Sequence, residues 1–399
     1  MEKTMKKSMT VRNGSIGACL GYAAFLFMSA PQWMFCQPLP KTFRVYVGTY
    51  TSGESNGIYV FGMEPATGVL HPMAMAAEAV NPSYMAFDPA HRYLYAVNEV
   101  KEFEGKPGGS VSAFSVDPQT GGLRLLNQQP THGGSPCYVA VDAKSRFVLT
   151  ANYGGGSLSV HPILPGGKLG PSTDFVQHYG SGPNKQRQEA PHTHSIVLDP
   201  ANRYAFAPDL GLDKIMAYRF DAERGKLKPN DPPWAGVEAG AGPRHFAFHP
   251  DGKHAYVINE LNSTIGAFRY DAAKGALEWI ETVKTIPGGF TGSNSCADVH
   301  VAPSGKYVYG SNRGHNSIAR FKIDLDTGKL TALGHVPTQG RTPRNFAIDP
   351  TGTFLLAANQ NTNTVVVFRI DQTSGELLAT GNGVQVPSPV CIQMVPVFK

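Results

Sequence analysis

The stretch GPRHFAFHPDGKHAYVINE at residues 242–260 decides the fold of this chain, because the sequence repeats its pattern. It contains a run of apolar and aromatic residues, a turn around Pro and Gly, and a second such run, which together predict a β-hairpin. Similar stretches stand at residues 81–99, 135–153, 192–210, 296–313 and 342–360. They recur about every 52 residues, and a fixed period of this size indicates a repeat architecture.

Each hairpin is followed by two more strand-like runs. A third run, such as SVSAFSVD (110–117) or TIGAFRYD (264–271), leads through a D-x-x-x-G-x-L turn into a fourth. Four antiparallel strands in about 50 residues are typical of a β-propeller blade. Six complete copies are present in the sequence.

A seventh copy is split between the two ends of the chain. RVYVGTY (44–50), GIYVF (57–61) and TGVL (67–70) match the second strand, the third strand and the following turn. The missing first strand resembles PSPVCIQMV (387–395). Because a ring must hide its open sheet edges, we predict that this C-terminal strand joins the N-terminal blade. The fold class is therefore all-β, a seven-bladed propeller with four-stranded antiparallel blades and almost no helix, with residues 41–399 as a single domain.

The first 36 residues have the pattern of an export leader. A basic stretch (3–12) precedes an apolar run (16–28), and the small residues Ser29 and Ala30 follow. The apolar run is short for spanning a bilayer. We predict a cleaved signal, export to the periplasm or the medium, and no stable membrane insertion afterwards; an uncleaved chain would stay in the cytoplasm.

Charge and cysteine content exclude several classes of function. The formal net charge is +5, most of it from the N-terminal stretch, and the rest of the chain has no basic cluster typical of nucleic-acid binding. The five cysteines, at 19, 36, 137, 296 and 391, show no paired spacing. We therefore expect neither a disulfide framework nor a Cys-x-x-Cys zinc site. We expect the mature protein to be a monomer with a small-molecule partner.

Aligning the copies with one another separates fold positions from candidate site positions. An Asn recurs at the end of the second strand, for example Asn98, Asn152 and Asn259, and we interpret it as structural. The neighbouring position varies, and so does the start of the first strand. Because these strand ends meet at one mouth of the propeller, the following residues should gather there: His194, Arg244, His245, Glu260, Asp298, Arg313 and Arg344. Arginines beside a carboxylate suit a small anionic substrate with a carbonyl group to polarise. The alternative is a set of ion pairs between blades.

The longest segment between hairpins, 161–191, leads into the third complete copy of the hairpin. Arg187, Glu189, His192 and His194 crowd its end, and long loops of this kind are often functional. His-x-His can supply two metal ligands, but we find no second dense cluster of Asp and His to support them. We expect no metal and no cofactor.

Strings along most of the chain resemble a known family. VGTYTSGESNGIYVF, NPSYMAFDP, ANYGGGSLSV, RQEAPHTHS, GPRHFAFHP, NEL, SNRG and PRNFAIDPTG are similar to the seven-bladed lactonase propellers, which include bacterial 6-phosphogluconolactonase and the fungal carboxy-muconate lactonising enzyme. The resemblance implies metal-free lactone chemistry with His194 (or His192), Arg244, Glu260 and Arg313 as catalytic residues. It also implies a cytosolic enzyme of the pentose phosphate pathway in glucose metabolism, which disagrees with the predicted leader.

These observations predict a hydrolase that opens a sugar δ-lactone, either 6-phosphogluconolactone or an unphosphorylated relative. Glu260 or a site histidine would act as general base on water, and Arg244 with His245 would stabilise the oxyanion. Arg313 and Arg344 would bind phosphate or sugar-acid oxygens. The further candidate substrate-binding residues are Arg187, Glu189, His192 and Asp298. Two alternatives remain open: a carboxy-muconate cycloisomerase using the same site, and a non-catalytic binding propeller.

Overall fold

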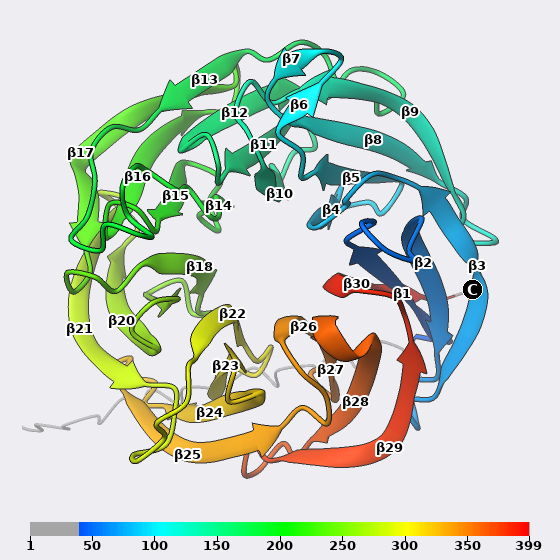
Figure 1. The fold of residues 1–399 in the computed structure, drawn as a ribbon, viewed down its shortest axis with the longest axis vertical. Coiled ribbons are helices and arrows are strands. Elements are labelled where there is room, and N and C mark those ends of the chain that lie inside the picture. The colour runs from blue at the N-terminus through cyan, green and yellow to red at the C-terminus, as the bar shows by residue number, and fades with distance from the viewer. Residues whose placement is uncertain (1–39, 399) are drawn as a thin grey trace, which may run out of the picture. The chain divides into compact units, whose positions relative to one another are not determined.

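The computed structural model describes residues 40–398, which belong to one compact unit. Seven four-stranded sheets stand around a common axis, and a two-stranded hairpin is added to them (Figure 1). One 3-10 helix, η1 (Gln360–Thr362), occurs among the described residues. The predicted seven-bladed all-β propeller is confirmed. The predicted leader at residues 1–36 lies outside the described residues. Between residues 40 and 398, no helix has the length and apolar character needed to cross a membrane.

The blades are numbered in chain order, each from its innermost strand outward. Blade 1 contains β30 (Pro389–Val397), β1 (Thr42–Thr49), β2 (Gly57–Met63) and β3 (Leu70–Glu78). Blade 2 contains β4 (Met85–Phe87), β5 (Tyr93–Asn98), β8 (Ser110–Val116) and β9 (Leu123–Pro130). Blade 3 contains β10 (Pro136–Val141), β11 (Phe147–Asn152), β12 (Ser157–Pro162) and β13 (Asp174–Gln177). Blade 4 contains β14 (Val197–Leu198), β15 (Tyr204–Asp209), β16 (Lys214–Asp221) and β17 (Lys226–Gly236).

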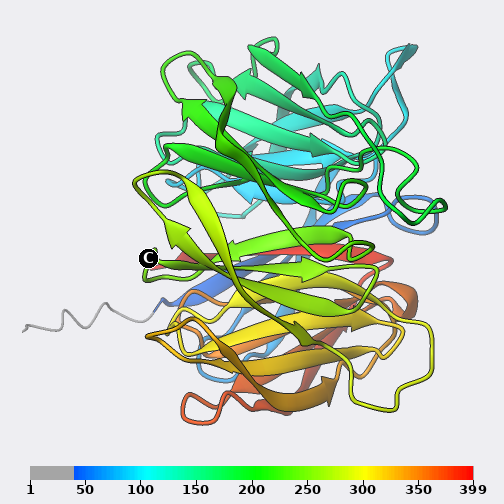
Figure 2. The same ribbon diagram turned by 90° about the vertical axis from the view of Figure 1, so that its left-hand side faces the viewer.

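The remaining blades follow the same order. Blade 5 contains β18 (Pro243–Phe248), β19 (His254–Asn259), β20 (Thr264–Asp271) and β21 (Ala276–Lys284). Blade 6 contains β22 (Ser295–Val301), β23 (Tyr307–Arg313), β24 (Ser317–Ile323) and β25 (Leu330–Pro337). Blade 7 contains β26 (Pro343–Ile348), β27 (Phe354–Asn359), β28 (Thr364–Ile370) and β29 (Leu377–Gln385). The extra hairpin, β6 (Glu102–Phe103) with β7 (Lys106–Pro107), interrupts blade 2 and was not predicted. In the edge-on view it lies on the same side as the long connections before β14 and β22 (Figure 2).

Contacts between blades repeat around the ring. The second strands are buried on both faces, so they consist of apolar and small residues throughout. A tyrosine in four of these strands donates its hydroxyl hydrogen to a glycine carbonyl of the next blade, as Tyr256 does to Gly328 at 3.0 Å. In three of the four cases (Gly121, Gly328 and Gly375) the glycine belongs to the D-x-x-x-G turn, where a positive φ and a closely packed ring exclude a side chain. At Gly275 (φ +64), for example, a Cβ would lie 2.2 Å from the ring of Tyr204.

The ring is closed by the two ends of the chain. β30 pairs antiparallel with β1, from Thr42 opposite Val397 to Thr49 opposite Pro389. The blue and red strands therefore lie side by side in one sheet (Figure 1). Without β30, one edge of β1 would be unpaired and blade 7 would lose its neighbour, since β26 and β27 both contact β30. The predicted sharing of a blade is confirmed.

Removing residues 387–399 should therefore unfold or aggregate the protein rather than trim its end. The deletion exposes the edge of β1 and the apolar surface against which Val390, Cys391 and Ile392 are buried. Removing 398–399 alone is the control, because Phe398 is exposed and follows the strand. Size-exclusion chromatography and thermal melting measure the difference. A monomeric 387–399 deletion with an unchanged melting temperature would show that closure does not stabilise the ring.

The recurring asparagine binds backbone, as the sequence predicts. Asn312 donates from Nδ2 to the carbonyl of Thr285 at 2.7 Å, and the hydroxyl of Thr285 donates to its Oδ1 at 2.9 Å. Asn98, Asn152 and Asn359 make the corresponding bond to the segment arriving from the previous blade. Asn259 differs, because its Nδ2 bonds to the hydroxyl of Thr264 in its own blade and to no carbonyl of the previous blade within residues 40–398. The asparagines therefore fasten successive blades together, except in blade 5.

Asn312→Ala should destabilise the fold by about 1–3 kcal/mol, because it leaves the buried backbone carbonyl and the hydroxyl of Thr285 without this partner. Asn259→Ala is the matched comparison and should cost less, since no backbone group depends on that side chain. Urea denaturation of both variants measures the two losses. Equal losses would contradict a role in joining blades.

Candidate functional site

A cavity of about 340 Å³ opens at the mouth where first strands begin and second strands end. Its lining residues are Glu99, Cys137, Tyr153, Arg187, His194, Glu260, Ser295, Arg313 and Arg344. The structure therefore brings together five of the candidate residues, namely Arg187, His194, Glu260, Arg313 and Arg344. They come from blades 4 to 7 and from the long connection before β14, so the ring must be complete for the cavity to exist.

Glu260, which directly follows β19, is the centre of a charge network. Its Oε1 lies 2.6 Å from Nη2 of Arg187, and its Oε2 lies 3.0 Å from Nε of Arg244 and 2.9 Å from Nη2 of Arg313. Burial raises the pKa of this carboxyl, but the three arginines outweigh burial and lower the pKa to about 2. Glu260 is therefore ionised at neutral pH, and its oxygens are already occupied by cations.

Arg244 lies behind the cavity instead of lining it. The residue is 2% exposed, and it binds Glu260 through Nε and the carbonyl of Ala297 through Nη1. Burial, together with Arg313 and Arg344, lowers its pKa to about 10, so it remains a cation at neutral pH. Arg244, which the sequence places in the site, does not line this cavity, and its guanidinium holds Glu260 in place.

His194 lines the cavity, whereas His192 does not. Burial lowers the pKa of His194 well below 6.5, and Arg244 acts in the same direction, so the imidazole is neutral at neutral pH. Its Nδ1 lies 3.5 Å from Sγ of Cys137, and its Nε2 lies 4.0 Å from Oε2 of Glu260. The ring of His192 stacks on Tyr153 at 4.6 Å between centroids, and its Nε2 lies 3.2 Å from exposed Glu189. His192 and Glu189 therefore support Tyr153 and do not reach the cavity.

Arg344, in β26, faces the cavity with an uncommitted guanidinium. Its charge lies 5.3 Å from the ring centroid of Tyr50, whose hydroxyl donates to Glu99 at 2.9 Å. Within residues 40–398 its side chain has no hydrogen-bond or ion-pair partner, unlike the other arginines of the site. Such a cation is available for an anionic group of a ligand.

His245 and Asp298 form a buried pair one layer below the cavity. Nδ1 of His245 lies 2.7 Å from Oδ1 of Asp298, and Nε2 of His300 lies 3.0 Å from Oδ2. Burial opposes ionisation of Asp298, but His300 and His245 outweigh it and lower the pKa of the carboxyl. The two residues do not line the cavity, and Asp298 binds residues of three neighbouring blades, including Asn345. The ring of His245 lies 5.4 Å from that of His194 and supports it from below.

The sequence reasoning missed four lining residues. Glu99, Cys137 and Tyr153 stand in the alignment columns that vary between blades, and an assignment of the whole columns would have found them. Ser295 lies in the irregular start of β22, where the pairing register shifts, and no repeat pattern marks it. Burial raises the pKa of the Cys137 thiol, so this group remains protonated beside His194.

The cavity does not fit a metal ion. Arg187, Arg313 and Arg344 line it, Arg244 lies directly behind it, and together they outnumber the carboxylates of Glu99 and Glu260. Glu260 already binds three of these cations, so it is not free to act as a ligand. Chemistry here must therefore rely on a neutral imidazole and on positive charge from arginine.

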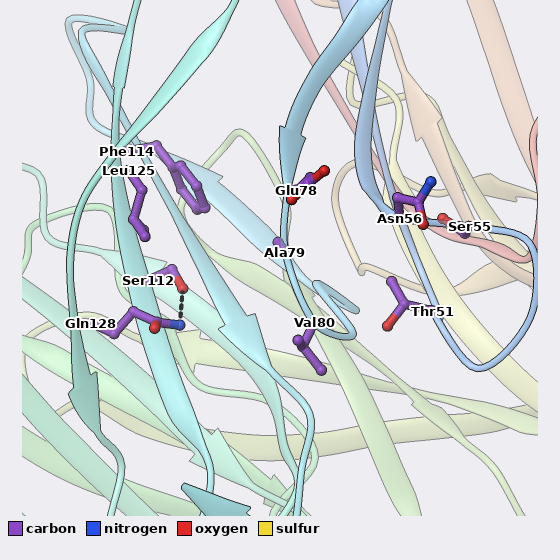
Figure 3. A pocket seen from close by; sticks show the side chains of 10 residues that line it. All are labelled: Thr51, Ser55, Asn56, Glu78, Ala79, Val80, Ser112, Phe114, Leu125 and Gln128. Carbon is purple, nitrogen blue, oxygen red and sulfur yellow. Dashed lines mark hydrogen bonds between the residues drawn. The ribbon is translucent and has the colours of Figure 1, made fainter. Parts of the chain in front are cut away.

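A larger hollow, of about 460 Å³, lies between the outer parts of blades 1 and 2 (Figure 3). Its lining includes the hydrogen-bonded pair Ser112 and Gln128, and Glu78 is its one ionisable residue. It lacks an acid and base pair and has no cation. The smaller cavity at the mouth is therefore the candidate active site.

Comparison with known proteins agrees with this architecture. Residues 44–394 match the family model described as lactonase, 7-bladed beta-propeller. A 6-phosphogluconolactonase of Bacillus subtilis is 39% identical over 353 residues, covering 88% of this chain and 97% of the relative. One of Formosa agariphila is 34% identical, covering 76% and 86%. A solved structure of a periplasmic gluconolactonase from Pseudomonas aeruginosa is 34% identical with a TM-score of 0.84, covering 89% of this chain and 99% of that one. This chain belongs to the family of seven-bladed β-propeller lactonases.

Proposed function

We propose that this protein hydrolyses a sugar δ-lactone at the mouth of the propeller. The observation that carries the proposal is a neutral, buried imidazole, His194, in a cavity where arginines exceed carboxylates. Ester hydrolysis needs a base for the attacking water and positive charge for the oxyanion that forms at the carbonyl. The relatives named 6-phosphogluconolactonase and gluconolactonase support a sugar lactone as the substrate.

In this mechanism His194 is the general base. Its imidazole removes a proton from water as the water oxygen attacks the lactone carbonyl carbon. The proton then passes to the ring oxygen as the carbon–oxygen bond breaks, which gives the open sugar acid. Glu260 is the other candidate base, but a carboxylate with a pKa of about 2 that binds three arginines accepts a proton poorly.

The arginines of the site have different roles in binding and in stabilising the oxyanion. Arg313 and Arg187 reach the cavity while held by Glu260, so they can stabilise the oxyanion without reorganisation. Arg344, which has no partner of its own, would bind the substrate's outer oxygens. Arg244 is a positioning residue that acts through Glu260. The same charges would suit a muconate carboxylate, but no residue specifically favours ring closure, and the acid–base character of the cavity argues against a binding platform.

Whether the substrate carries a phosphate group depends on the compartment in which the protein acts. With the predicted leader the chain is exported, and a phosphorylated sugar is an unsuitable substrate outside the cytoplasm. The periplasmic gluconolactonase among its structural relatives supports this reading. We therefore propose an exported enzyme acting on an unphosphorylated gluconolactone-like substrate. Comparing kcat/KM for gluconolactone and 6-phosphogluconolactone by proton release tests it, and rates equal to spontaneous hydrolysis for both would refute lactonase activity.

Arg344→Met should weaken the interaction with the substrate without destabilising the fold. Because Arg344 has no hydrogen-bond or ion-pair partner within residues 40–398, the variant should keep its melting temperature while kcat/KM falls by about 10–100-fold, the cost of one hydrogen bond to a charged group. Arg244→Met is the matched comparison, because it breaks a buried ion pair and should cost about 3 kcal/mol of stability. If Arg344→Met retains full activity, this guanidinium does not contact the substrate.

The pH dependence should follow His194. Its pKa in the folded state is below 6.5, so kcat/KM should be constant from pH 6.5 to 7.5 and fall only at more acid pH. Folded His194 and Glu260 bind fewer protons than their unfolded forms, so the free energy of unfolding should also decline as the pH falls below 6.5.

His194→Asn should lower kcat by about 10²–10⁴-fold and remove the decline of kcat/KM at acid pH. His71→Gln, at an exposed histidine far from the cavity, is the control. An unchanged acid limb in His194→Asn would assign the base to another group.

A further inference from the structure

A second cluster of ionisable residues lies in the turn between β18 and β19 of blade 5. Nδ1 of His249 is 2.9 Å from Oδ1 of Asp251, and Nδ1 of His254 is 2.8 Å from Oδ2 of the same carboxylate. One ligand atom from each residue lies within 4.8 Å of those from the other two. This turn is at the opposite end of the strands from the cavity. The expectation that the chain has no second dense cluster of His and Asp overlooked it.

The other blades show that the fold does not require these histidines. The position of His249 is Asp in four other hairpins, for example Asp199, whose Oδ1 accepts hydrogen bonds from two backbone N–H groups of the turn. The position of His254 is Tyr or Phe in the other five hairpins, and that ring packs against a glycine of the next blade. His254 packs against Gly328 in the same way. Blade 5 has therefore replaced both repeat residues with histidine at one turn.

The hydrogen bond of His249 leaves its other nitrogen facing a carboxylate. Nε2 lies 2.7 Å from the carbonyl oxygen of Gly305, and since a carbonyl can only accept, Nε2 carries the hydrogen. In the neutral ring, Nδ1 is then the acceptor: it takes the backbone N–H of Asp251 at 3.1 Å, and it also lies 2.9 Å from a carboxylate oxygen of the same residue. A cation bound by both electron-rich atoms would relieve their repulsion, and Nδ1 would release the N–H of Asp251 to bind it. Metal-binding histidines generally donate their second N–H to a carbonyl in this manner.

We propose that His249, Asp251 and His254 bind a divalent first-row transition metal ion such as Zn²⁺. Two imidazoles and one carboxylate are a suitable ligand set for such ions. The histidines are buried, whereas the Asp251 side chain is 24% exposed, so an ion can enter from solvent and keep water as a further ligand. Gly305 and Gly328 both belong to blade 6, so the bound ion fixes the junction of blades 5 and 6. The site is separate from the lactonase cavity and does not depend on that activity.

The test uses untagged protein freed of metal with a chelator. Calorimetric titration with Zn²⁺ should show one equivalent per chain, and Zn²⁺ should raise the melting temperature because the ion binds the folded state. The double variant His249→Asp with His254→Phe restores the residues of the other blades, so it should fold. It should lose both the bound equivalent and the Zn²⁺-dependent rise in melting temperature. His71→Gln, which removes an exposed histidine paired with Glu64, should retain both.

Two results would overturn the proposal. One is a folded wild-type protein that binds no Zn²⁺ and melts identically with and without chelator. The other is a double variant that binds Zn²⁺ as the wild type does, which would place the ion elsewhere, for example at His192. Absorption of Co²⁺-loaded protein provides a second readout, since its ligand-field bands should be present in the wild type and absent from the double variant.

Discussion

The structure depends on one constraint: every blade needs a neighbour on both faces, so the ring has to close. A single blade has apolar side chains on both faces of its inner strands and cannot bury them alone. The tyrosine-to-glycine and asparagine-to-carbonyl bonds then repeat at successive junctions. The pairing of β30 with β1 completes the set, because it supplies the inner strand that blade 7 packs against.

Closure also creates the candidate active site. Glu260 of blade 5 binds Arg313 of blade 6 and Arg187 from the connection before blade 4, so one carboxylate ties three parts of the ring together. The sequence left two readings of these charges open, a catalytic set or ion pairs between blades; the structure contains the ion pairs, and the catalytic role is the one we propose. The ion pairs hold two arginines in the cavity in a fixed geometry, whereas Arg344 has no ion pair of its own within residues 40–398 and is balanced only by the field of Glu99 and Glu260. A site built in this way needs little rearrangement when an anion binds.

The sequence predicts the fold almost completely, because repetition makes the strand pattern visible seven times. It also predicts at which ends of the strands five of the candidate residues gather around one cavity. The sequence cannot predict how deeply each arginine is buried. Arg244 and Arg344 occupy the same alignment column, yet Arg244 is buried behind Glu260, whereas Arg344 has no hydrogen-bond or ion-pair partner within residues 40–398. That difference arises because a carboxylate follows the second strand in blade 5 (Glu260), where blade 7 has Gln360. The β6–β7 hairpin and Ser295 were missed because they lie in insertions and irregular starts that no other copy shares.

The register of the closing pair has a mechanical consequence. Thr42 lies opposite Val397, so both chain ends leave the sheet from the same end of the β1–β30 pair. A force that pulls the two ends apart therefore acts perpendicular to the strands. It breaks the hydrogen bonds between β1 and β30 one after another, starting at Thr42 and Val397, instead of loading all of them at the same time. The ring would open at low force although its thermal unfolding requires many junctions to fail at once. A protein tethered at one end only never experiences this load, whereas attachment at both ends to two stiff partners would place it on the β1–β30 pair.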